Sequence, residues 1–178
     1  MEWKTLKKGV GYKSKWTTLR RDEVINPKGE EGIYDFVDSQ PSVMVVPLTK
    51  NGEIYLVKVF RYPTQEYSWE LPGGRTDGAD IKKTAINELR EETGLIAEEC
   101  NKIGSFYPLN GLSNELCHVF LATDLTQTNK DSMKEDAISE KRAFKQNEVY
   151  EMIINGVITD GQSISSLLLA RLHLHPRT

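Results

Sequence analysis

The sequence predicts a mixed α/β domain that is preceded by a β-hairpin. In the main part of the chain, short apolar runs such as 42–48 and 54–60 occur together with segments of helical periodicity such as 162–174. In the amino-terminal part, strand-forming residues lie on both sides of the turn signal Asn26-Pro27-Lys28-Gly29. A length of 178 residues fits one domain with a sizeable core and a small appendage.

The hairpin elements come first in the chain. Residues 16–24 are rich in strand formers, and residues 33–37 alternate between apolar and polar like a half-buried strand. Because two strands alone are marginal in water, this hairpin must pack on the main domain or on another chain. Pro41 marks a boundary, so we expect a hairpin subdomain over 1–40 and a main domain over 41–178.

The main domain is expected to hold five strands and three helices. Asp80 and Asn147 are the expected starts of the first two helices, and Gly94 and Gly156 are their expected stops. Residues 61–80 are expected to be irregular around a glycine loop, and the polar residues 124–137 to form a mobile loop. The expected strands are 42–48, 54–60, 103–107, 116–122 and 138–144, and the expected helices are 81–93, 147–155 and 162–174.

Composition excludes several classes of function. A hydrophobic content of 38%, a charged content of 28% and a net charge of −3 are ordinary for a globular protein and give no basic surface for nucleic acid. No apolar run approaches the ~20 residues that cross a bilayer, and the start of the chain does not resemble a secretory signal. The 2 cysteines make neither a disulfide framework nor a zinc site, so we expect a cytoplasmic protein.

The strongest candidate site combines a glycine turn with an acidic helix. Glu88, Glu91 and Glu92 have the spacing of neighbours on a helix, where like charges cost ~0.2–0.5 kcal/mol per pair. The turn at Gly73-Gly74 lets the backbone approach a ligand closely. A Glu-rich helix face is more often simply solvated, but carboxylates beside a loop carbonyl suit Mg²⁺ or Mn²⁺.

These residues resemble the sequence box of the Nudix hydrolases. The box reads Gly, five residues, Glu, seven residues, then Arg-Glu-apolar-any-Glu-Glu-any-Gly-apolar. The resemblance implies an α/β/α sandwich with a mixed sheet, and metal ligands at Glu88, Glu91, Glu92 and the carbonyl of Gly73. The matching positions are Gly73, Glu88, Leu89, Glu91, Glu92, Gly94 and Leu95.

Two positions depart from the box. Ala79 stands where the first glutamate belongs, and the loop is one residue short, so that Asp80 can take the acidic place. Asn87 replaces the arginine that helps to hold the glutamates in the family. An asparagine still donates hydrogen bonds to a carboxylate, but without a charge.

The resemblance extends to the ADP-ribose pyrophosphatase branch over about residues 16–172. It implies a homodimer that exchanges the amino-terminal hairpin, with Trp16 and Tyr34 stacking on the base of a nucleoside diphosphate sugar. It also implies that Arg61 contacts the diphosphate and that Gly111 contacts the substrate, although Asn110 replaces the proline associated with ADP-ribose. From the residues alone, Trp16 and Tyr34 would be hairpin packing, and a lone Arg61 would be a surface residue.

The resemblance implies hydrolysis of the diphosphate link in a nucleoside diphosphate-X compound, with ADP-ribose or a nucleotide sugar as the best match. The family's general base is a loop glutamate, for which Glu135 is the first choice and Asp136, Glu140 and Glu115 are reserves. Glu91 shares or bridges a metal ion in this mechanism.

Two rival functions remain. Asn87 and Ala79 favour a Nudix-fold nucleotide sensor that no longer turns over, whereas the intact trio of glutamates favours the enzyme. A pyrophosphatase acting on nucleoside triphosphates is disfavoured because smaller members of that type lack the hairpin.

Overall fold

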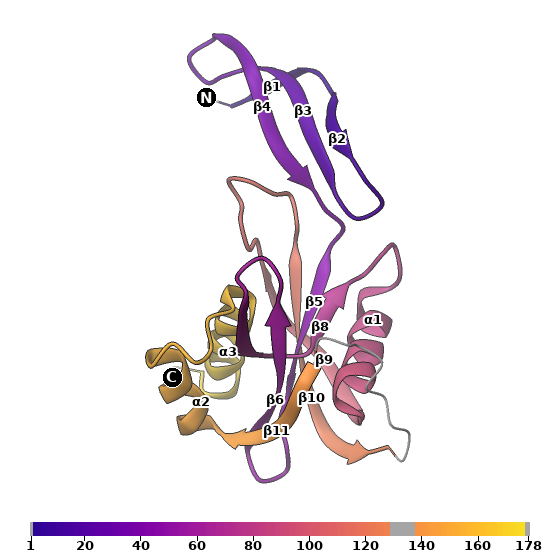
Figure 1. The fold of residues 1–178 in the computed structure, drawn as a ribbon, viewed down its shortest axis with the longest axis vertical. Helices are drawn as coiled ribbons and strands as arrows, with labels where there is room; N and C mark the ends of the chain where they lie inside the picture. The colour runs from indigo at the N-terminus through magenta and orange to yellow at the C-terminus, as the bar shows by residue number, and fades with distance from the viewer. Residues whose placement is uncertain (1, 129–137, 177–178) are drawn as a thin grey trace. The chain divides into compact units, whose positions relative to one another are not determined.

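The structure, a computed structural model, describes residues 2–128 and 138–176 and divides into two compact units (Figure 1). The amino-terminal unit comprises Met1–Gln40 and Tyr107–Leu116, and the main unit comprises Pro41–Phe106 and Cys117–Thr178. Within the two described stretches, no helix is long and apolar enough to span a bilayer.

The main unit contains two sheets and three α-helices. One sheet is mixed, with the order β8-β5-β10-β9 and with β5 parallel to β10; the other is antiparallel, with the order β11-β6-β7. The strands are β5 (Ser42–Pro47), β6 (Glu53–Arg61), β7 (Glu66–Glu70), β8 (Gly73–Arg75), β9 (Leu95–Phe106), β10 (Cys117–Gln127) and β11 (Ile138–Lys145). The helices are α1 (Ile81–Glu88), a π-helical turn η1 (Leu89–Thr93), α2 (Gln146–Ile154) and α3 (Gly161–Leu174).

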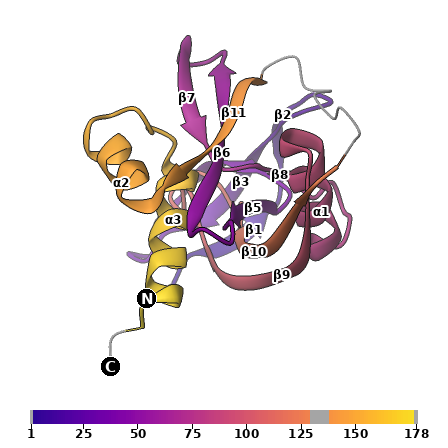
Figure 2. The same ribbon diagram turned by 90° about the horizontal axis from the view of Figure 1, so that it is seen from below.

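Helices cover both faces of the mixed sheet, as Figure 2 shows for α1 on one side and α3 on the other. Along β5, Val43 and Val45 pack with α1, while Met44 and Val46 pack in the cluster that includes α3. Every residue of β5 is buried, which explains why its sequence is a continuous apolar run rather than an alternating one. This arrangement confirms the predicted α/β/α sandwich.

Several elements differ from the expectation. The segment 61–80, predicted to be irregular, contains β7 and β8, and β9 begins at Leu95 rather than near residue 103. β10 continues to Gln127, inside a predicted loop, because it pairs with the first residues of β9. The polar composition of residues 124–127 hid the end of β10, since strand preference depends on the pairing partner more than on the residues themselves.

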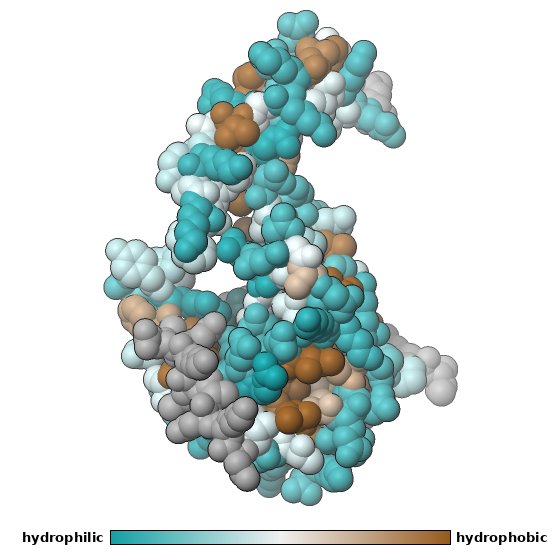
Figure 3. All heavy atoms as spheres, turned by 90° about the vertical axis from the view of Figure 1, so that its right-hand side faces the viewer, coloured by the Kyte–Doolittle hydropathy of each residue, from teal (hydrophilic) through white to brown (hydrophobic). Residues whose placement is uncertain are grey.

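The amino-terminal unit is a four-stranded antiparallel sheet rather than a simple hairpin. The predicted hairpin is present as β3 (Thr18–Ile25) and β4 (Glu31–Asp38), and β1 (Lys4–Lys7) and β2 (Val10–Lys13) both pair with β3. Its surface shows hydrophobic residues scattered among hydrophilic ones (Figure 3). The exposed large hydrophobic side chains of the four-stranded sheet and its turns are Trp3, Leu6, Val10, Tyr12, Trp16 and Ile33.

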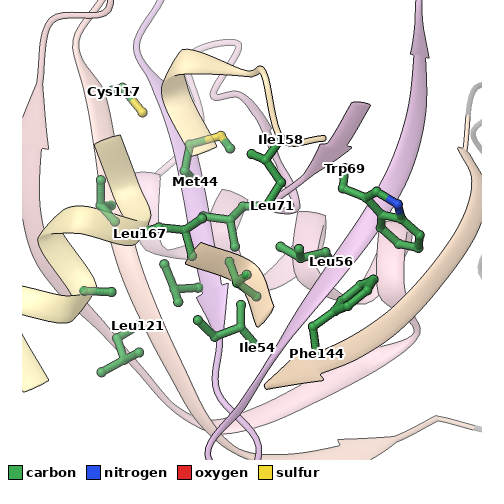
Figure 4. Packing of buried hydrophobic residues seen from close by; sticks show 14 residues of the cluster. Met44, Ile54, Leu56, Trp69, Leu71, Cys117, Leu121, Phe144, Ile158 and Leu167 are labelled. Atoms are coloured by element: carbon green, nitrogen blue, oxygen red, sulfur yellow. The ribbon is translucent and has the colours of Figure 1, made fainter. Parts of the chain in front are cut away.

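A hydrophobic core joins β7 and the segment after it to α3 in the main unit (Figure 4). Trp69 contacts Phe144 edge to face, with ring centroids 4.8 Å apart. Leu71 packs in the same cluster as Leu167 of α3 and Ile158. Because Trp69 and Leu71 are both fixed in this core, Glu70 between them and the glycine turn after them have a rigid base.

Candidate active site

The segment Pro72-Gly73-Gly74, which keeps the name glycine turn, meets the acidic helix. The prediction of a turn at Gly73-Gly74 is wrong, because both glycines lie in the short strand β8, which pairs with β5. The backbone N–H of Gly73 donates a hydrogen bond of 2.9 Å to Oε2 of Glu92. Glu92 is only 6% exposed, which is unusual for a carboxylate. A buried charge requires compensating partners, and this charge-assisted hydrogen bond is one of them.

The carboxylate of Glu88 lies directly against Gly74. A Cβ atom added at Gly74 would stand 2.5 Å from Oε1 of Glu88, and one added at Gly73 would stand 2.3 Å from the carbonyl oxygen of Val43. Neither position accepts a side chain without a shift of its neighbours. The two glycines therefore allow the turn to fit between β5 and the acidic helix.

The helix that carries the glutamates changes its hydrogen-bonding pattern at Leu89. The predicted helix 81–93 is α-helical to Glu88 and continues as the π-helical turn η1, and Gly94 ends it with a φ of 76°. Asp80 caps the start of α1 by accepting a hydrogen bond of 2.9 Å from the N–H of Lys83, as predicted. Single π turns inside α-helices occur frequently at functional sites.

The third glutamate has a different environment. The side chain of Glu91 is 55% exposed and lies 3.5 Å from the guanidinium of Arg90. Asn87, which replaces the arginine of the family box, accepts a hydrogen bond of 3.4 Å from the same guanidinium. Arg90 thus links Asn87 and Glu91 on the solvent side of the helix.

The donor chemistry at the turn fits a divalent cation. Across residues 2–128 and 138–176, no three His, Cys, Asp or Glu side chains stand close enough together to hold a metal ion. Mg²⁺ does not need such a group, because it is commonly bound by one or two carboxylates and completes its shell with waters and substrate phosphates. Glu88 and Glu92, both at the glycine turn, supply carboxylates of this kind.

The cationic side chain of Arg61 lies near the acidic residues of the site. Arg61, at the end of β6, donates from Nη2 to Oε2 of Glu70 at 2.6 Å. This hydrogen bond to Glu70, together with the nearby charges of Asp160 and Glu92, raises the pKa of Arg61. Sequence reasoning missed Glu70; its only signal was a charged residue inside the apolar segment that leads to the glycine turn.

The start of α3 supports the glycine turn. The N–H of Leu71 donates to Oγ of Ser163 at 2.9 Å, and the N–H of Ser163 donates to Oδ2 of Asp160, the N-cap residue of α3, at 2.7 Å. The contact between Leu71 and Ser163 could not be predicted, since these residues lie far apart in the sequence.

Of the remaining candidates, which lie in the amino-terminal unit, Gly111 contacts Tyr34 and Trp16 lies apart from their pocket. The hydroxyl of Tyr34 donates to the carbonyl oxygen of Gly111 at 3.2 Å, and both residues line a pocket of about 410 Å³. Trp16 is not among the residues lining this pocket; it is 65% exposed, with the ammonium of Lys15 4.5 Å above its ring. The pocket is lined by Tyr34, Phe36, Tyr107, Asn110, Gly111, Leu112, Ser113 and Asn114.

The candidate general bases are only partly described. Glu135 and Asp136 lie outside the described residues. Glu140 is exposed on β11, where it pairs with Lys58 of β6. The backbone N–H of Glu115 donates to Oγ of Ser113 in the amino-terminal unit.

Comparison with known proteins assigns both parts of the chain. Residues 38–166 match the family model described as NUDIX domain. The chain belongs to the Nudix hydrolase family. Residues 3–37 match a second family model, the nucleoside diphosphate sugar hydrolase N-terminal domain.

Individual relatives agree with this assignment. The ADP-ribose pyrophosphatase of Bacillus subtilis is 32% identical over 154 residues, which cover 86% of this chain and 78% of that protein. The methanol dehydrogenase activator of Bacillus methanolicus is 27% identical over 173 residues, covering 96% and 94%. The crystal structure of an ADP compounds hydrolase shares the fold, with a TM-score of 0.85 at 16% identity over 100% of this chain and 98% of that one.

The family and these relatives place the chain in the ADP-ribose pyrophosphatase branch of the Nudix hydrolases. Nudix hydrolases generally use divalent metal ions.

Proposed function

We propose that this Nudix hydrolase cleaves the diphosphate link of ADP-ribose or a related nucleotide sugar and releases a nucleoside monophosphate and a sugar phosphate, with Mg²⁺ or Mn²⁺ as cofactor. The observation that carries the proposal is the buried carboxylate of Glu92, hydrogen-bonded to the Gly73 N–H. The Glu88 carboxylate lies against Gly74 of the same turn.

Each side chain of the site has a role in this proposal. Glu88 and Glu92, with the carbonyl of Gly73, would hold the cation, and Glu91 would share it once its side chain leaves Arg90. A divalent ion bound there neutralises diphosphate oxygens and lowers the pKa of a bound water. Arg61 donates hydrogen bonds to the diphosphate. Glu135 accepts the proton of the attacking water as general base.

The amino-terminal unit recognises the base in this proposal. The match of residues 3–37 to the amino-terminal domain of nucleoside diphosphate sugar hydrolases supports it. Trp16 and Tyr34 supply aromatic faces for stacking, and Gly111, hydrogen-bonded to Tyr34, shapes the pocket that Tyr34 lines.

The functional form in this proposal is a homodimer in the cytoplasm. The exposed apolar side chains of the amino-terminal sheet are available to a second copy, and sedimentation equilibrium tests that association. The division proposed here is a dimerisation and base-binding subdomain over 1–40 and a Nudix domain over 41–178. Cys100 and Cys117, both buried as thiols, suit a reducing compartment.

A substrate panel tests the proposed activity. ADP-ribose, other ADP-sugars, UDP- and GDP-sugars and nucleoside triphosphates are each incubated with the full chain and Mg²⁺ or Mn²⁺, and nucleoside monophosphate release is scored. We expect monophosphate and sugar phosphate in equal amounts from at least one nucleoside diphosphate sugar, and no release when the metal is chelated. Tight binding without release across the panel would instead support the nucleotide sensor.

A further inference from the structure

The pair formed by Arg61 and Glu70 has an unusual distribution of burial. The carboxylate of Glu70 is 4% exposed, whereas the side chain of Arg61 is 55% exposed. An exposed arginine does not need a partner, because water can solvate it. A buried carboxylate does need one, since an unpaired buried charge is strongly destabilising.

The hydrogen bonds to Glu70 use one edge of the Arg61 guanidinium. Nε of Arg61 donates to Oε1 and Oε2 of Glu70 at 3.1 and 3.2 Å, and Nη2 donates to Oε2 at 2.6 Å. Nη1 of Arg61 donates no hydrogen bond to any described residue. The two N–H groups of Nη1 therefore remain available to a ligand while the other edge is held.

Glu70 is itself held rigidly. The residue before it, Trp69, packs edge to face on Phe144 (Figure 4), and the residue after it, Leu71, donates its N–H to Ser163 of α3. A long arginine side chain loses much rotamer entropy when it is immobilised. Fixing Arg61 on a rigid acceptor before the substrate arrives removes that cost from the binding step.

The position of the pair connects it to the acidic helix. β6, which ends at Arg61, contacts η1, which carries Glu92, and the charges of Glu92 and Asp160 both act on the guanidinium of Arg61. A diphosphate bound to a cation at Glu92 would then be within the reach of the same guanidinium.

We propose that Glu70 is a positioning residue, whose buried carboxylate holds the guanidinium of Arg61 with Nη1 free to bind a diphosphate oxygen. This inference rests on the proposed function, in which Arg61 contacts the diphosphate. Glu70 acts only through Arg61 and touches neither the substrate nor the cation.

A double-mutant cycle tests this assignment. Steady-state kinetics with ADP-ribose and Mg²⁺ are measured for the wild type, Glu70→Ala, Glu70→Gln, Arg61→Ala and the double variant Arg61→Ala/Glu70→Ala. Without Glu70 the substrate itself must immobilise the side chain of Arg61, so Glu70→Ala should raise KM about tenfold while kcat changes by less than about threefold. Glu70→Gln keeps one acceptor oxygen and the side-chain volume, so its KM should lie between those of the wild type and Glu70→Ala.

The double variant separates positioning from other roles. If Glu70 acts through Arg61, adding Glu70→Ala to Arg61→Ala should change KM by less than about twofold. Additive effects in the double variant, or a wild-type KM in Glu70→Ala, would overturn the proposal. If Glu70→Ala does not fold, the KM of Glu70→Gln decides in the same way.

Two further results separate this inference from the proposed function. A wild-type KM in Arg61→Ala would show that Arg61 does not bind the diphosphate, whereas a raised KM in Arg61→Ala with a normal KM in Glu70→Ala would refute the role of Glu70 alone. Glu148→Ala is the matched control, because Glu148 also pairs with an arginine, Arg142, at 3.8 Å, but on an exposed surface. Its KM and kcat should equal those of the wild type.

Discussion

Glu92 combines two properties that are seldom found together: it is buried, and it accepts a hydrogen bond from a backbone N–H of a glycine turn. A backbone donor cannot turn away, so one carboxylate oxygen is fixed in place. In the proposed mechanism a divalent cation offsets much of the remaining cost of burying the charge. Glu88, held against Gly74, adds a second carboxylate from the preceding helical turn.

Replacing Glu92 by glutamine should separate metal binding from folding. The amide oxygen of Glu92→Gln still accepts the hydrogen bond from Gly73, but the charge for the cation is lost. We expect kcat/KM at fixed Mg²⁺ to fall by about a hundredfold or more, with a far-UV circular dichroism spectrum like that of the wild type. Glu98→Gln, on the exposed part of β9, is the control that should keep full activity. Near-full turnover by Glu92→Gln would show that Glu92 is not a metal ligand.

At the scale of residues, the sequence predicted that Glu88 and Glu92 lie on one helix, because this follows from local spacing, but the turn predicted at Gly73-Gly74 is instead part of strand β8. It could not predict that Arg61 would bond to Glu70. That contact depends on the pairing of β6 with β7, and β7 was not recognised as a strand.

Among the elements, α3 has a role beyond closing the core. In its first turn, the hydroxyl of Ser163 accepts a hydrogen bond from the N–H of Leu71. Asp160 caps the helix by accepting a hydrogen bond from the N–H of Ser163. Leu71, which directly precedes Pro72-Gly73, is thereby hydrogen-bonded to α3, the helix that packs on the face of the mixed sheet opposite α1. A shift at this contact would be transmitted to the turn that meets Glu88 and Glu92.

Removing the hydroxyl of Ser163 should destabilise the protein and loosen the turn. Ser163→Ala leaves the buried N–H of Leu71 without its acceptor, which costs about 1–3 kcal/mol in the free energy of unfolding, measured by urea denaturation. Ser166→Ala is the matched control, since Ser166 is equally buried on α3 and its hydroxyl has no hydrogen-bond partner among the described residues. The account of α3 is wrong if Ser163→Ala costs no more than Ser166→Ala.

Long periodic elements were predictable, whereas their interruptions were not. The apolar runs predicted β5 and β6, because a strand buried on both faces has a continuous apolar sequence. The helical period predicted α3, because a helix buried along one side repeats its apolar residues with that period. The π turn leaves no mark in the spacing of apolar residues. The short β7 and β8 form only because β6 and β5 offer them hydrogen-bonding edges.

The whole molecule consists of an amino-terminal antiparallel sheet and a Nudix sandwich. The sequence predicted one hairpin in the first unit, but β1 and β2 also pair with β3, and the segment Tyr107–Leu116 joins that unit from far along the chain. Hydrogen bonds between Val37 and both Leu112 and Asn114 make that connection. Such non-local pairing cannot be read from local patterns. It places Gly111 beside Tyr34, where the proposed base pocket lies.

Crystals grown with Mn²⁺ and the α,β-methylene analogue of ADP-ribose test the proposed metal site most directly, because anomalous scattering locates the ion without assumptions. The account predicts a Mn²⁺ peak bound by the carboxylates of Glu88 and Glu92 at about 2.0–2.2 Å, with an oxygen of the bound analogue in the same coordination shell. A Mn²⁺ ion located away from the Gly73-Gly74 turn, or both carboxylates directed into bulk water while the analogue is bound, would contradict it.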